Sequence, residues 1–200
     1  MIFSFKQFIV KTTLVAVLAA MGLQAKAQTN SQTTRYNYFF LEAIRQQEMG
    51  NLAAAFDLLR HARNINPNAP EVYYELAGYY VEMQNNKAAR YNFERAAELA
   101  PNNSTYLEKL GQFYITQNDY EQALAAYEKL YANNKTREDV LQILYQLYGS
   151  QNNYKKMIEV TERMETLLGS SEQLSLTKMQ IFEQMGDKRK AQAELMRLVQ

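Results

Sequence analysis

The stretch that decides the fold is PEVYYELAGYYVEMQNNKAARYNFERAAELAPNN, residues 70–103. Its first half places Tyr73, Leu76 and Tyr80 three and four residues apart, the spacing of one apolar helix face. Its second half repeats that spacing after the polar hinge Gln84-Asn85-Asn86. The stretch therefore predicts two short amphipathic helices joined by a tight turn.

The same pattern recurs every 34 residues on both sides of this stretch, and no gap is needed. The small second-helix position is occupied by Ala55, Ala89, Ala123, Met157 and Ala191. An aromatic first-helix position is occupied by Tyr80, Tyr114, Tyr148 and Phe182, and a hinge position by Asn51, Asn85, Asp119, Asn153 and Asp187. Asn and Asp tolerate left-handed backbone geometry, so this hinge position is expected to hold the left-handed residue. A hairpin cannot bury its apolar face alone, so each unit needs a neighbour.

These residues resemble the tetratricopeptide-repeat family, whose pattern is W-x2-L-G-x2-Y followed by Ala, an aromatic residue, Ala and Pro. Residues 70–103 carry that pattern as Tyr73, Leu76, Ala77, Tyr80, Ala89, Phe93, Ala96 and Pro101. Other units depart from it at Glu42, Tyr145, Met157, Thr161, Lys178 and Met179. The resemblance implies an all-α fold, a right-handed superhelical solenoid of antiparallel helix pairs.

About five repeats are expected, at 36–69, 70–103, 104–137, 138–171 and an incomplete 172–200. The predicted helix pairs are 36–48 with 52–65, 70–83 with 87–99, 104–117 with 121–133, 138–151 with 155–168, and 172–185 with 188–200. The last repeat ends inside its second helix, and it places Met179, Phe182, Leu195 and Leu198 where earlier units meet their next neighbour. We therefore expect the polypeptide to continue past Gln200 or to associate with itself through this uncapped end.

The first 27 residues differ from the rest of the chain. Lys6 and Lys11 precede an apolar run from Thr12 to Leu23, and Ala25-Lys26-Ala27 supplies small residues for a peptidase. This is the pattern of a cleavable signal peptide, and the run is shorter than the roughly 20 residues that a spanning helix needs. Residues 28–35, rich in Gln, Asn, Ser and Thr, are expected to form a disordered lead-in. The expected location is the periplasm or cell envelope.

Composition excludes several kinds of function. Residues 1–27 contain three lysines and no acid, so residues 28–200 hold 19 basic and 21 acidic residues, a net charge of −2 that argues against nucleic-acid binding. There is no cysteine, and His61 is the only histidine. A lone histidine, expected on an outer helix face, suits neither a transition-metal site nor a catalytic dyad. We expect no enzyme activity, metal or cofactor.

In the family, the first helices of successive hairpins line a concave groove, and the register says which side chains should face it. The predicted groove residues are Phe40, Ile44, Glu48, Glu71, Tyr74, Glu82, Glu108, Gln112, Ile115, Asp139, Gln142 and Gln146. The register adds Gln47, Gly78 and Val81, and no groove position carries Lys or Arg. The groove is therefore expected to be acidic with apolar contacts, which suits an extended neutral or basic polypeptide segment.

Three functions remain compatible with these features. The first is a scaffold or adaptor of the cell envelope that binds polypeptides. The second is the extracytoplasmic sensor region of a longer membrane signalling protein. The third is the recognition region of a longer enzyme, whose catalytic domain would follow residue 200. A downstream apolar run of about 20 residues would favour the sensor.

Overall fold

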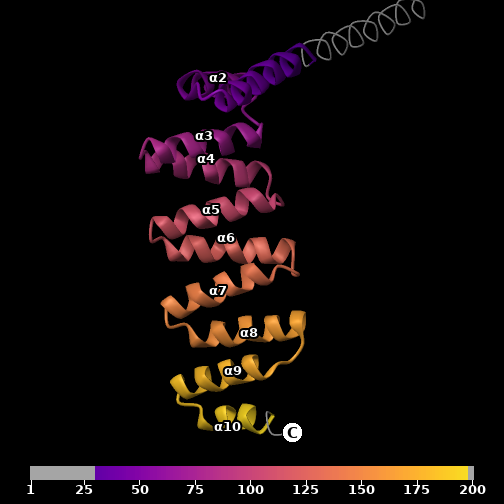
Figure 1. The fold of residues 1–200 in the computed structure, drawn as a ribbon, viewed down its shortest axis with the longest axis vertical. Coiled ribbons are helices and arrows are strands. Elements are labelled where there is room, and N and C mark those ends of the chain that lie inside the picture. Colours follow the sequence, from indigo (N-terminus) through magenta and orange to yellow (C-terminus); the bar gives the residue numbers. More distant parts are fainter. Residues whose placement is uncertain (1–29, 198–200) are drawn as a thin grey trace, which may run out of the picture. The chain divides into compact units, whose positions relative to one another are not determined.

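The computed structural model describes residues 30–197, and every regular element in that part of the chain is a helix (Figure 1). Residues 30–48 form the first helix. The following helices are α2 (Leu52–Ile65), α3 (Pro70–Glu82), α4 (Asn86–Leu99), α5 (Ser104–Thr116), α6 (Tyr120–Asn133), α7 (Glu138–Ser150), α8 (Tyr154–Leu168), α9 (Glu172–Gln184) and α10 (Lys188–Arg197). Neighbouring helices pack together in pairs, α3 with α4, α5 with α6, α7 with α8 and α9 with α10. The predicted all-helical fold and its helix pairs are confirmed.

The start of the first helix differs from the prediction. Residues 30–35 were expected in a disordered lead-in, and the structure has them in the helix that runs to residue 48. Their side chains are exposed, whereas Tyr36 is buried. Once packing fixes the helix from Tyr36 onward, adding further turns avoids the cost of nucleation, so polar residues can extend it. The predicted signal peptide, 1–27, lies outside the described residues.

The hinge residues also take different roles from those expected. The left-handed residue lies one position earlier than predicted, at Gly50, Gln84, Asn118, Asn152 and Gly186, whose φ angles lie between 53° and 80°. In three of the five hinges, the Asn or Asp that follows caps the second helix with its side chain instead. Asn153 accepts a hydrogen bond from the Lys156 amide at 3.2 Å, and Asp187 accepts one from the Lys190 amide at 3.1 Å. These acceptors satisfy amides that have no partner within the helix.

The chain forms two compact units, up to Leu99 and from Ala100 onward, each with its own packing. In the first unit, α2 and α3 bury Leu59, Ala62, Val72 and Leu76 in one apolar cluster, with Ala55 and Ala43 beside them. Phe56 on α2 packs on Tyr79 of α3, with ring centroids 5.7 Å apart. These contacts show how consecutive repeats meet inside the unit: the second helix of one repeat packs on the first helix of the next.

In the second unit the same arrangement joins α6 to α7 and α8 to α9. Its core includes Tyr127, Leu130, Val140, Leu141 and Leu144, all fully or almost fully buried. Gly111 on α5 faces the Tyr127 ring so closely that an added Cβ would lie 2.7 Å from it. The small residue expected by the repeat pattern is therefore required by contact with an aromatic side chain of the paired helix.

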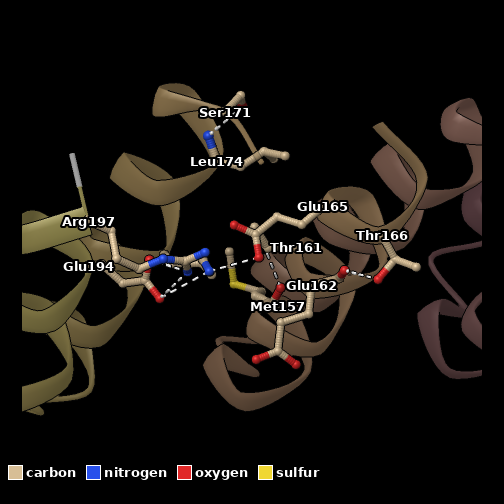
Figure 2. A network of polar contacts seen from close by, with 10 residues as sticks. Met157, Thr161, Glu162, Glu165, Thr166, Ser171, Leu174, Glu194 and Arg197 are labelled. Atoms are coloured by element: carbon tan, nitrogen blue, oxygen red, sulfur yellow. Dashed lines mark hydrogen bonds and ion pairs between the residues drawn. The ribbon is translucent and has the colours of Figure 1, made fainter. Parts of the chain in front are cut away.

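The last repeat replaces the usual core leucine with a buried lysine. The side chain of Lys178 on α9 is 4% exposed, and its Nζ lies 2.8 Å from Glu165 of α8 and 3.0 Å from Glu194 of α10. Glu165 and Glu194 thus approach the ammonium from two helices, and Arg197 also pairs with Glu194 at 3.2 Å (Figure 2). The departure at Lys178 noted in the sequence therefore creates an ionic contact that joins three helices.

Candidate peptide-binding surface

The first-unit groove residues lie on the two first helices of its repeats. Phe40, Ile44, Glu71 and Tyr74 are half-buried, and Glu48 and Glu82 are exposed. None is in the core, so all six are accessible in part, as a contact surface requires. Glu71 accepts a hydrogen bond from the Tyr36 hydroxyl, so this carboxylate already has a partner inside the unit.

A small pocket lies on this surface, between the end of the first helix and α3. It has a volume of about 90 Å³ and is lined by Gln47, Leu52, Glu75, Gly78, Tyr79 and Glu82. Gln47, Gly78 and Glu82 were predicted groove positions. Glu75 and Tyr79 were not predicted, because the groove positions taken from the family do not include the positions of these two residues. The spacing of Glu71, Glu75, Gly78 and Glu82 would have shown that all four share one helix face.

In this pocket two carboxylates lie on either side of Gly78, where no side chain covers the helix backbone. Glu75 and Glu82 lie two turns apart on α3 with Gly78 between them, and nothing lies within 4 Å of where a Gly78 side chain would begin. Tyr79 donates a hydrogen bond from its hydroxyl to the Gln47 side-chain oxygen at 3.3 Å. The lining residues include no lysine or arginine. An incoming cationic or amide donor would therefore meet acceptors on two sides.

Burial changes the ionisation of the groups in this pocket. Burial raises the pKa of the Glu75 carboxyl above its ordinary value, although a hydrogen bond with Gln47 opposes that shift. Burial also raises the pKa of Tyr79, with a further contribution from the nearby Glu75 and Glu82 charges. A carboxyl that loses solvation without gaining a cation is stabilised when a positive partner arrives. Glu75 is such a carboxyl.

The second-unit groove residues are also accessible, but they are less acidic than the sequence predicted. Gln112, Asp139, Gln142 and Gln146 are exposed, and Glu108 and Ile115 are half-buried. Arg137 lies 3.0 Å from Glu108, and its Nε donates to Asp139 at 2.7 Å. These two bonds raise the pKa of the Arg137 guanidinium and lower that of Asp139. Arg137 thus pairs with two of the five acidic groove residues and offsets one of their two negative charges.

Arg137 was missed because it precedes α7 as its N-cap residue, outside the first-helix positions considered for the groove. Its partner Glu108 is 29 residues away. The pocket at Glu75 and Glu82 therefore has no basic residue in its lining, whereas Arg137 offsets part of the negative charge of Glu108 and Asp139.

Among residues 30–197 no group of three His, Cys, Asp or Glu side chains could hold a metal ion. Over that range, none of the helices is both long and apolar enough to cross a membrane. His61 is exposed, as expected, and its ring packs edge-on against Phe39 at 4.2 Å.

Comparison with known proteins identifies the repeat. The sequence model of the tetratricopeptide repeat matches residues 70–103 and 104–136, the two units closest to the family pattern. No curated protein sequence matches the chain.

Solved structures with the same fold match much more of the chain. MamA from Desulfovibrio magneticus RS-1 is 16% identical over 82% of this chain and 93% of its own, with a TM-score of 0.55. A tetratricopeptide repeat protein from Parabacteroides merdae ATCC 43184 is 18% identical over 83% of this chain and 66% of its own, with a TM-score of 0.59. YrrB, a repeat protein with an unusual peptide-binding site, is 15% identical over 78% and 81%, with a TM-score of 0.57. Residues 70–136 therefore carry tetratricopeptide repeats, and the helix pairs of the chain share the fold of the solved structures that contain such repeats.

Proposed function

We propose that this chain is an interaction module that binds extended polypeptide segments along the first helices of its repeats. Repeats of this family are typically interaction modules without enzyme activity. The observation that carries the proposal is the pocket at Gln47, Gly78 and Tyr79, where two carboxylates flank exposed backbone. YrrB, which shares the fold, has a peptide-binding site.

The preferred ligand follows from the charges in that pocket. A lysine or arginine side chain of the bound segment would enter between Glu75 and Glu82, with its aliphatic stem against Leu52 and Tyr79. Half-buried Glu75 gains more from a cationic partner than an exposed carboxylate does, because less water competes for it. The peptide backbone would lie along α3 past Gly78, where no side chain obstructs it.

This preference is testable with three labelled peptides of one length, in which alanine spacers separate Lys, Gln or Glu residues. The Lys peptide is expected to bind the full chain most tightly. Glu75→Gln with Glu82→Gln should weaken that binding about 5- to 10-fold, since each exposed ion pair contributes up to ~1 kcal/mol. The measurement is fluorescence anisotropy at low salt, where exposed charges are least screened.

Lowering the pH should also weaken binding. Because the pKa of Glu75 is raised, this carboxyl takes up its proton at a higher pH than an ordinary glutamate. The proton removes the charge that attracts the lysine, so the affinity for the Lys peptide should fall before exposed acids titrate, while the Gln peptide is unaffected.

A matched control removes the same number of charges elsewhere. The control variant combines Glu98→Gln and Glu121→Gln, two exposed positions on the second helices α4 and α6. Its affinity for the Lys peptide should equal that of the wild-type chain. Equal binding of the Lys and Gln peptides, or equal loss in the control variant, would contradict the proposal.

Two further parts of the proposal concern location and assembly. The lysines, apolar run and Ala25-Lys26-Ala27 at the start support export to the periplasm or envelope. N-terminal sequencing of the native protein should then find Gln28 first, and a native chain that still begins at Met1 would rule cleavage out. Self-association through the C-terminal repeat is a second candidate activity, supported by the exposed Leu195 and Met196 of α10 and by the cavity between α9 and α10.

A further inference from the structure

The last helix pair leaves an apolar hollow open to solvent. Between α9 and α10 lies a cavity of about 450 Å³, lined by Met179, Glu183, Gly186, Lys188, Ala191, Gln192 and Leu195. Leu195 is 46% exposed, although its register equivalents Leu59, Tyr127 and Thr161 are fully or almost fully buried. In the second unit such positions lie beside a following first helix, because α6 contacts α7 and α8 contacts α9. The face of α9 and α10 is therefore shaped for a first helix.

The helix at residues 30–48 exposes the matching face. Tyr38 is 64% exposed and Leu41 is 66% exposed. The register equivalents of Tyr38 in α3 and α7 are Val72 and Val140, both fully buried, and each of these helices packs on a preceding second helix of its own unit. Tyr38 thus occupies the position that a first helix buries against a preceding repeat, and Leu41 adds a second exposed apolar side chain to the same helix.

We infer that the helix at residues 30–48 of one copy docks on the α9 and α10 face of a second copy, head to tail. This inference rests on the proposed self-association and names the surface that meets the C-terminal repeat. Each apolar face covers the other, and the contact continues the packing already present between α2 and α3. Because the two faces differ, the contact is heterologous, and each copy in a pair keeps one face free to bind a further copy.

Charges at the rim support this pairing. Inside the first unit, Tyr79 of one repeat bonds to Gln47 of the preceding repeat at 3.3 Å. At the docked contact, Arg45 of the docking helix occupies the repeat position of Tyr79. Glu183 of the second copy occupies the repeat position of Gln47. Arg45 already pairs with Glu42, but a guanidinium has five donors and can bond to a second carboxylate. A salt bridge between Arg45 and Glu183 is the charged counterpart of the hydrogen bond seen inside the unit.

The apolar contact follows from the same register. Glu75 lines the small pocket beside Gln47 and Leu52, and its equivalent in the docking helix is Leu41. The equivalents of Gln47 and Leu52 are Glu183 and Lys188, which line the large cavity. Leu41 would therefore enter the cavity between them, against Met179 and Leu195.

The test separates the two faces with one substitution on each, in the full chain. Leu41→Asp places a charge in the docking face of the first helix, and Leu195→Asp places one in the docking face of the last repeat. Both side chains are exposed in the single chain. Both variants should therefore fold, which circular dichroism checks. Wild type is expected to form concentration-dependent oligomers in sedimentation velocity, and each variant alone should be monomeric. An equimolar mixture of the two variants should form a one-to-one dimer that cannot extend, since it combines one intact face from each.

Charge exchange gives an independent measurement. Arg45→Glu and Glu183→Arg should each raise the dissociation constant of wild-type association at least 10-fold, and the double variant should recover most of that loss. Lys129→Glu, exposed on α6, should change nothing. If Leu41→Asp associates like wild type while Leu195→Asp does not, the C-terminal repeats pair with each other and the head-to-tail inference is overturned. A wild-type chain that stays monomeric at every concentration overturns both this inference and the proposed self-association, and peptide binding is measured separately.

Discussion

Lys178→Leu is expected to lower the free energy of unfolding by about 3–5 kcal/mol, although leucine is the residue that the repeat pattern prefers there. The lysine holds two carboxylates, Glu165 and Glu194, in a site where its own side chain is 4% exposed. Replacing it leaves the buried Glu165 charge without an ion-pair partner, whereas Glu194 keeps Arg197. An uncompensated buried charge costs more than the apolar contact returns. Within the described residues, the buried Oε1 of Glu165 has no hydrogen-bond partner, and Lys178 is bonded to the other oxygen of this carboxylate.

The control removes the whole ionic group. Lys178→Leu combined with Glu165→Leu and Glu194→Leu is expected to be within about 1 kcal/mol of wild type or more stable, since a buried ion group can often be replaced by packed apolar residues. Urea unfolding followed by circular dichroism measures all variants. If Lys178→Leu alone is as stable as wild type, the ionic contact between α8, α9 and α10 does not stabilise the last repeat.

Tyr127→Ala is expected to cost about 3–5 kcal/mol, the range seen when a large buried aromatic side chain is truncated. The Tyr127 side chain is 1% exposed, and its ring fills the space opposite Gly111. Burial raises the pKa of its hydroxyl to about 12, so the ring is neutral at physiological pH. Truncation would leave a cavity between α5 and α6 that the backbone cannot fully close. Tyr127→Phe keeps the ring and should lose far less.

The contact between Gly111 and Tyr127 can be measured by a double-mutant cycle. Gly111→Ala alone should destabilise by roughly 1–3 kcal/mol, because its Cβ would overlap the tyrosine ring. In the Tyr127→Ala background the same change should stabilise by about 0.5–1 kcal/mol, since alanine is the better helix former and the obstruction is gone. A Gly111→Ala effect of the same sign in both backgrounds would show that the two residues act independently.

Much of this architecture follows from local rules that a sequence displays. Spacing of three and four residues fixes which side of a helix is apolar, and the 34-residue interval fixes where each helix begins and ends. The helix boundaries of α2 to α9 agree with the prediction to within one residue. The location of each hinge was predicted correctly. Which of its two adjacent residues adopts the left-handed backbone conformation depends on the geometry of the helix cap. In the α3–α4 hinge that residue is Gln84 and not Asn85.

Only part of the candidate peptide-binding surface could be predicted from the sequence, for a physical reason. Periodicity assigns a residue to a helix face, which is why the six first-unit groove residues are all accessible. It does not say which side chains from distant helices reach one another. Arg137 meets Glu108 from 29 residues away.

The amino-acid sequence by itself therefore determined the repeat, its helices and the apolar faces that join neighbouring units. Tertiary structure alone decided which charges are paired: Arg137 pairs with Glu108 and Asp139, while the lining of the pocket at Glu75 and Glu82 contains no cation. It also decided that Lys178, read as a departure from the pattern, is buried between two glutamates. Charge pairing depends on side-chain length and rotamer across packed helices, and these are set only when the helices are in place.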